Sequence, residues 1–218
     1  MKTLLAAVLA GLSLSSPWPA SMAAEDKPEP FLEAQSLFER GLRGSEKDNE
    51  QAAEKFRALT EQEPDNPLYL AYYGSTFTLK ARDAYMPWNK LKLGEQGLDM
   101  IDKSLKKLGP EHDRQLLRSV PLSIETCLVA VNTFLKVPDQ FFHRYDRARS
   151  LLAQTMNGEV FAAAPAAIQA RFYFQAAFVA QTERKKQEEI NLLKRVAELD
   201  PKSLDAPAAA ARLKELGQ

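Results

Sequence analysis

The sequence contains few of the residues that carry out chemistry. Among 218 residues there are one cysteine and two histidines. A single cysteine excludes an intrachain disulfide framework and a cysteine-rich zinc site. The 29 basic residues balance 29 acidic ones, which removes the usual argument for nucleic acid or an anionic membrane as the partner. With 45% apolar residues, the composition instead predicts a folded protein with a sizeable core.

Motifs of catalysis and nucleotide binding are also missing. The sequence has no phosphate-binding glycine loop and no G-x-S-x-G, H-E-x-x-H or C-x-x-C motif. Cys127 lies in the apolar stretch 124–131, which predicts a small buried residue. His112 stands at the start of a predicted helix and is expected to be exposed, while His143 and Asp146 are one turn apart, as on a solvated helix face. We therefore expect no enzymatic activity, no cofactor and no bound metal.

The first 24 residues have the pattern of a secretory signal peptide. A basic residue precedes the apolar run 4–14, and serine and proline residues follow it. Cleavage is predicted after Ala23 or Ala24, which leaves a charged leader at residues 25–30. The run is shorter than the roughly 18 apolar residues of a membrane-spanning helix, so an uncleaved anchor is the weaker alternative. We expect a periplasmic or secreted protein whose mature chain has no membrane span.

Apolar residues recur at helical spacing along almost all of the remaining chain. Ala52, Phe56 and Leu59 form one such stripe, and similar stripes follow toward the C-terminus. Proline-containing turns such as 64–67 separate the stripes. The sequence thus predicts an all-α fold of short helices with short connections, which makes neighbouring helices antiparallel. Pro121 is expected to kink or split the helix predicted for residues 113–136.

Two segments share a longer pattern. In the first, Phe56 leads into the turn 64–67, and Tyr73-Gly74 follows where glycine permits close helix approach. The second, residues 170–203, has the same length and ends at a proline turn. Both resemble the tetratricopeptide repeat (TPR), a helix–turn–helix unit of about 34 residues. The resemblance implies helix pairs stacked as a right-handed superhelix, an α-α solenoid, whose concave groove binds a protein or peptide.

The resemblance also implies a single domain over residues 31–217. Its units are predicted at about residues 31–66, 67–110, 111–157 and 170–203, followed by a cap helix at 204–217. The second unit departs from the repeat because an extra loop of about ten residues is expected after Phe77. A generic helical bundle with coincidental proline turns is the alternative.

This extra loop is the first candidate partner-binding surface. Large amphipathic side chains next to arginine are the composition of interaction hot spots. The residues in question are Arg82, Asp83, Tyr85, Met86, Trp88 and Lys90. The alternative is that Tyr85, Met86 and Trp88 fold back over the helix ends and have a structural role.

A second candidate surface lies on the first helix of the late repeat. It consists of Arg171, Phe174 and Phe178. The resemblance to the TPR family places these side chains in the groove, together with Ala71, Ser75 and Thr78 of the earlier unit. The alternative for the two phenylalanines is a place in the core.

The leading expectation is a non-catalytic adaptor that binds a protein or peptide partner in an assembly of the cell envelope. A small-ligand-binding protein, with its pocket between the extra loop and the concave face, is the second hypothesis. The third is an enzyme on a helical scaffold, which would need His112 or His143 to meet a carboxylate in a cleft. No nucleic-acid partner is expected, and the pattern does not specify an oligomeric state.

Overall fold

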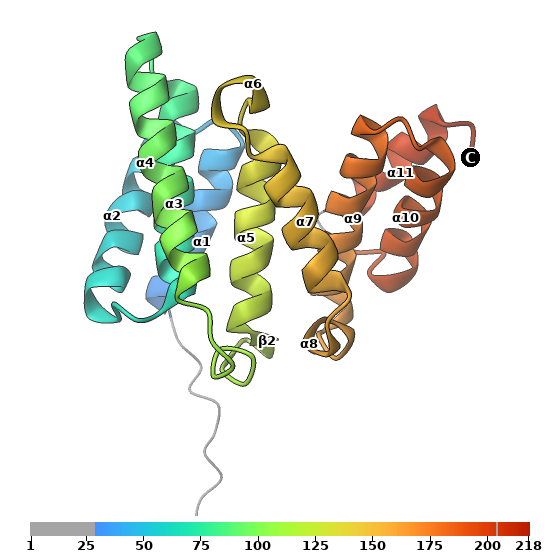
Figure 1. Cartoon of the computed structure of the whole chain (residues 1–218), viewed down its shortest axis with the longest axis horizontal. Helices are drawn as coiled ribbons and strands as arrows, with labels where there is room; N and C mark the ends of the chain where they lie inside the picture. The colour runs from blue at the N-terminus through green and yellow to red at the C-terminus, as the bar shows by residue number, and fades with distance from the viewer. Residues whose placement is uncertain (1–28, 204) are drawn as a thin grey trace, which may run out of the picture.

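A computed structural model describes residues 29–203 and 205–218, and these residues are almost entirely helical (Figure 1). The prediction of an all-α fold is confirmed. The predicted signal peptide 1–24 and residues 25–28 of the predicted leader 25–30 lie outside the described residues, whereas Glu29 and Pro30 begin the first helix. Within the described part, no helix combines the length and the apolar character needed to cross a membrane.

The first half of the chain forms four helices, each packed against the next. They are α1 (Glu29–Leu42), α2 (Glu46–Gln62), α3 (Pro67–Asp83) and α4 (Pro87–Lys106). Local signals set their ends. The Ser45 hydroxyl accepts from the backbone N–H of Asp48, and Asn66 Oδ1 accepts from that of Leu68, with Pro67 as the first residue of α3. These are ordinary N-cap interactions, and the predicted turn at 64–67 is present.

The second half continues in the same way toward the other end of the molecule (Figure 1). Its helices are α5 (Leu122–Lys136), α6 (Asp139–Phe142), α7 (Tyr145–Met156), α8 (Glu159–Ala162), α9 (Ala166–Thr182), α10 (Lys186–Leu199) and α11 (Ala206–Glu215). The α5 and α7 helices lie between α1–α4 on one side and α9–α11 on the other. The predicted cap helix corresponds to α11, which packs on α10.

An aromatic cluster forms the core of the N-terminal half. The rings of Phe56 and Tyr72 are stacked with centroids 4.8 Å apart, and Phe31 and Phe38 meet them edge-on. All four side chains are buried. Burial of this much aromatic surface is the main stabilising contribution in this region, and the ring geometry adds to it.

Two glycines bring α3 and α4 into close contact. A Cβ atom added to Gly74 would lie 2.6 Å from the carbonyl oxygen of Gly97, and one added to Gly97 would clash with the carbonyl oxygen of Gly74. Only glycine on both helices permits this approach. The expectation that Gly74 marks a close helix contact is therefore confirmed.

The extra loop predicted after Phe77 is wrong. The α3 helix runs on to Asp83 and α4 already begins at Pro87, so only residues 84–86 connect them. Pro87 occupies the first turn of α4, a position where the N–H that proline lacks would have no partner within the helix.

The helix predicted over 113–136 is also wrong in its first part. A short antiparallel hairpin, β1 (Leu116–Leu117) with β2 (Val120–Pro121), precedes α5, and Pro121 is the N-cap residue of that helix. Pro121 therefore separates the hairpin from α5. Further along, the stretch 140–156 is divided into α6 and α7 at His143, whose φ of 52° is left-handed.

Candidate binding cleft

A cleft of about 370 Å³ crosses four helices. We call it the α1–α9 cleft. Its lining residues are Gln35, Phe38, Glu39, Leu42 and Arg43 at α1, Tyr72, Ser75, Thr78 and Leu79 of α3, Val129, Asn132, Thr133, Leu135 and Lys136 of α5, Arg171, Phe174, Gln175 and Phe178 of α9, and Asp205. Each predicted unit therefore contributes its first long helix to one concave surface.

Residues predicted from two distant parts of the sequence meet in this cleft. Arg171, Phe174 and Phe178 line it from α9, and Ser75 and Thr78 line it from α3. Phe178 is 43% exposed, which is unusual for so large an apolar side chain. Ala71 was also expected in the groove, but it is completely buried because it packs within the aromatic core.

The floor of the cleft is polar and tightly hydrogen-bonded. Gln35 Nε2 donates to the Tyr72 hydroxyl at 3.0 Å, and that hydroxyl donates to Glu125 Oε1 at 3.2 Å. Next to them, the hydroxyls of Ser75 and Thr133 are 2.8 Å apart. Buried hydrogen bonds of this kind fix the side chains in one arrangement, so the floor is preorganised.

An ion pair between the buried Glu125 and the partly exposed Arg118 lies directly behind this floor. Arg118 Nη2 donates to Glu125 Oε1 at 3.0 Å, and its Nη1 donates to Gln35 Oε1 at 2.8 Å. Arg118 and Ser119 are the two turn residues of the hairpin, with φ of 51° and 65°, a left-handed conformation that is unfavourable for residues other than glycine. The contacts with Glu125 and Gln35 hold the arginine in this conformation.

Burial is the main cause of the pKa shifts in this network. It raises the pKa of the Glu125 carboxyl, against the opposing influence of the Arg118 and Arg171 charges. Burial, with a contribution from the nearby Glu125 charge, also raises the pKa of the Tyr72 hydroxyl. Tyr72 therefore stays protonated and acts as a donor to the carboxylate.

Charged side chains stand around the opening of the cleft. Arg171 forms no ion pair or side-chain hydrogen bond with any residue in the described part of the chain. Asp205 lies close enough to feel the charges of Arg171 and Lys136, but burial outweighs them and raises the pKa of its carboxyl. The guanidinium of Arg171 is thus available to a ligand that enters the cleft.

The residues predicted on the extra loop lie elsewhere, at the connection between α3 and α4. Arg82 donates to the carbonyl oxygens of Gly41 and Leu42 at 3.0 and 3.3 Å and forms a two-point ion pair with Asp83. Lys90 Nζ donates to the carbonyl oxygen of Arg82 at 2.9 Å. Arg82 thus fastens the end of α3 to the end of α1, and Lys90 joins the first turn of α4 to the end of α3.

The apolar residues of the same connection are exposed. Tyr85 is 90% and Trp88 65% exposed, and Met86 is also at the surface. They do not fold back over the helix ends, and none of them lines the α1–α9 cleft. The structure therefore separates the first candidate surface into an internal fastening and an external apolar group.

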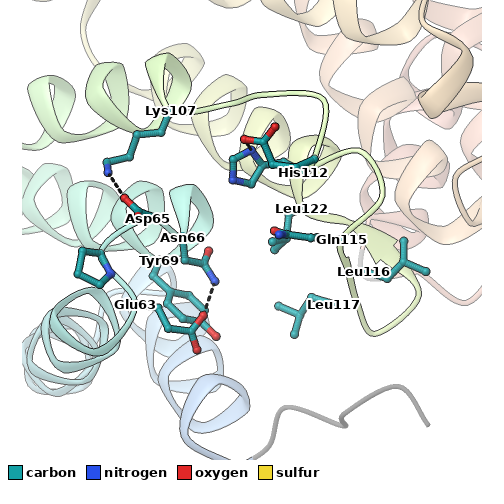
Figure 2. Close-up of a pocket in the computed structure, with 12 residues that line it drawn as sticks. Glu63, Asp65, Asn66, Tyr69, Lys107, His112, Gln115, Leu116, Leu117 and Leu122 are labelled. Carbon is teal, nitrogen blue, oxygen red and sulfur yellow. Dashed lines mark hydrogen bonds and ion pairs between the residues drawn. The ribbon is translucent and has the colours of Figure 1, made fainter. Parts of the chain in front are cut away.

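A second hollow, about 780 Å³ and more open to solvent, lies between the α2–α3 turn and the segment 107–122 (Figure 2). Figure 2 shows Lys107 extended toward Asp65, an ion pair of 3.3 Å, and Asn66 directed to Glu63. The polar groups on this side of the hollow thus pair with one another. His112 lies on the opposite wall.

His112 is buried, contrary to the expectation of an exposed residue. The turn at 109–112 folds the imidazole inward, and Nδ1 accepts the backbone N–H of Gly109 at 2.9 Å and lies 3.3 Å from Glu111 Oε1. His143 is exposed, as expected. Cys127 is buried, also as expected, and burial raises the pKa of its thiol to about 11. No group of three potential metal ligands occurs among the described residues.

Some of the cleft residues were not foreseen. Gln35, Tyr72 and Arg118 come from three separate segments and meet only in the folded chain. Only Glu125 could have been suspected from the sequence. It is a carboxylate inside the apolar stretch 124–131, and a carboxylate that is buried there needs a hydrogen-bonding or charged partner.

Comparisons with protein-family models, with curated proteins and with solved structures find no match to this chain.

Proposed function

We propose that this protein is a periplasmic or secreted TPR-like adaptor, without catalytic activity, that binds a protein or peptide segment in the α1–α9 cleft. Its setting would be an assembly of the cell envelope. The observation that carries the proposal is the cleft itself, where Arg171, Phe174 and Phe178 meet Ser75 and Thr78 on one concave surface.

The packing of the helices supports the TPR-like interpretation. In addition to the contacts between consecutive helices, α1 contacts α3, α3 contacts α5, and α5 contacts α9. A stack in which the first helices of successive pairs touch one another is what a helical-repeat array requires, because each unit completes the core of its neighbour. The same three contacts generate the cleft.

The chemistry of the cleft suits a peptide segment. Apolar side chains of a ligand can pack against Phe38 and Leu79 on one side and Phe174 and Phe178 on the other.

Site-specific photo-crosslinking in living cells tests the proposal. A benzophenone amino acid at Phe178 or Gln175 is expected to give a discrete adduct with one envelope protein, because both positions line the cleft. Matched controls are Arg57 on α2 and Lys194 on α10, which are exposed and line none of the described hollows. Equal adducts at all four positions, or none at the cleft positions, would contradict the proposal.

A small amphipathic ligand is the second candidate, favoured by the cleft volume of about 370 Å³, which lies within the range of small-molecule sites. The pocket would lie wholly in the cleft, since residues 84–90 do not line it. A compound that binds only the folded state raises the melting temperature, and Phe178→Ala should abolish that shift. A screen of envelope extracts without any Phe178-dependent shift would remove this candidate.

A further inference from the structure

The connection between α3 and α4 projects from the molecule. In Figure 1 this end of the two helices extends beyond the neighbouring helices. Every residue from 85 to 92 is exposed, and Leu91, at 41%, adds a further apolar side chain to those of Tyr85, Met86 and Trp88. We call residues 84–92 the α3–α4 tip. A convex surface of this composition is rare on a protein that is surrounded only by water.

The charge around the tip differs from that of the whole chain. Residues 80–92 contain four basic residues and one acidic residue, whereas the complete chain has formal charge zero. Arg82 and Asp83 neutralise each other in their ion pair. Lys80, Lys90 and Lys92 remain, and none of them has an ion-pair partner within the described residues. The tip therefore combines exposed apolar groups with a local positive charge.

We propose that the α3–α4 tip binds the surface of an anionic phospholipid bilayer. Trp88 and Tyr85 have an apolar body and a polar end, the combination found at the membrane–water interface. Lys92 lies on the turn of α4 that follows, where its ammonium group reaches lipid phosphates while its apolar stem stays beside the acyl boundary. This inference is independent of what occupies the α1–α9 cleft.

The alternative occupant, a protein, fits the tip less well. A specific protein contact needs polar groups in fixed directions, but the fixed polar groups of this region, Arg82 and Asp83, are turned inward to α1 and to each other. The groups left outside are large apolar side chains and the ammonium group of Lys92, which suit a fluid surface of negative charge.

A second apolar residue lies at the same end of the molecule. Phe141 of α6 is 58% exposed. The α6 helix packs on α4, where the neighbouring Phe142 ring fills the space beside Gly94. In Figure 1 α6 and the tip lie at the same end. If the tip and Phe141 both contact the bilayer, these two separate contacts would fix the orientation of the protein on it.

Tryptophan fluorescence offers a direct test. The sequence has two tryptophans, at positions 18 and 88, so the chain from Glu25 onward carries Trp88 as its single reporter. Vesicles of phosphatidylglycerol and phosphatidylethanolamine should shift its emission to the blue and bring it within reach of brominated acyl chains. Zwitterionic phosphatidylcholine vesicles should have little effect. Lys92→Glu should lower the partition coefficient about tenfold, because each basic residue near such a surface contributes measurably to binding.

Co-sedimentation with the same vesicles provides the controls. Trp88→Ser and Leu91→Ser together should abolish binding while the circular dichroism spectrum stays unchanged. Leu116→Ser is the matched control, because Leu116 is 62% exposed but belongs to the hairpin at the opposite end of the molecule. Absence of binding to anionic vesicles, or binding that the tip variants leave intact, would overturn the proposal. A blue shift caused only by a protein partner would overturn it as well.

Discussion

The α1–α9 cleft and the α3–α4 tip are two surfaces of opposite construction. The cleft is concave, and its floor is fixed by a chain of hydrogen bonds from Gln35 through Tyr72 to Glu125. The tip is convex, and its apolar side chains contact mainly solvent, while its fastening to α1 lies behind them. A fixed floor can select among ligands by shape and hydrogen bonding, whereas mobile exposed groups adapt to any suitable surface.

The comparison also concerns stability. Behind the cleft, the buried Glu125 carboxylate depends on its partner Arg118, so the replacement of either residue disturbs the fold together with the site. The outer residues of the tip have few contacts, so their replacement should change binding alone. Substitutions in the two regions should therefore differ in their effect on the free energy of unfolding.

The largest effect is expected for Arg118→Met. It removes the partly exposed cationic partner of the buried Glu125 carboxylate and should lower the free energy of unfolding by about 2–3 kcal/mol, as measured by urea denaturation, because a hydrogen bond to a charged group contributes about 1.5–3 kcal/mol. The double variant with Glu125→Gln should recover most of the loss, because no charge is then left buried. A double variant no more stable than Arg118→Met would show that the hairpin, rather than the ion pair, carries the effect.

Gly97→Ala tests whether the close contact between α3 and α4 holds the tip in place. Its added methyl group would clash with the carbonyl oxygen of Gly74, and such overpacking costs about 1–3 kcal/mol. This outcome runs against helix propensity, which favours alanine by about 1 kcal/mol. A lower melting temperature is therefore expected. An unchanged or higher one would mean that α3 and α4 can separate freely and that the tip is not rigidly held.

Glu125 should make stability depend on pH in a direction unusual for a carboxyl group. Its pKa is higher in the folded than in the unfolded chain, so the folded state holds the proton more tightly. The resulting stabilisation is complete below the ordinary glutamate pKa of 4.5 and is lost as the pH rises through the folded value. Each unit of difference corresponds to about 1.4 kcal/mol.

The difference in free energy of unfolding between the wild type and Glu125→Gln isolates this contribution. Relative to the variant, the wild type should become less stable as the pH is raised from about 4.5 toward 8. A difference that is constant over this range, or that changes in the other direction, would contradict the assignment.

The smallest effect on stability is expected at the tip. Trp88→Ser should change the free energy of unfolding by less than about 0.5 kcal/mol, because surface substitutions without buried contacts usually do. Phe174→Ala at the cleft, where the side chain is half-buried and packs in the C-terminal core, should cost more. If the two values were equal, the contrast between the surfaces would not hold.

Much of the fold could be predicted because it depends on local signals. Apolar residues at helical spacing and the Asn66-Pro67 turn correctly placed the helices around them. The extra loop was predicted wrongly, because the contacts of Arg82 and Lys90 that hold the short α3–α4 connection join residues far apart or in different helices and leave no local signal in the sequence. The hairpin was missed because Leu117 and Val120 also fit a helical stripe.

The cleft could be predicted only in part. Arg171, Phe174 and Phe178 lie on one helix, so their shared face follows from the helical period. The ion pair behind the floor does not, because Arg118 has a left-handed conformation that its own sequence does not favour. Its position depends on partners far along the chain.

Those long-range partners have a consequence for the order in which the chain folds. Tyr72 bonds with Glu125, 53 residues later, and Gln35 bonds with Arg118, 83 residues later. A ribosome releases the N-terminal helices first, so α1 to α3 emerge well before the groups that satisfy their buried polar atoms. Until residue 125 has been synthesised, the N-terminal half of the protein cannot complete its buried hydrogen bonds, so its folding should finish only after α5 has emerged.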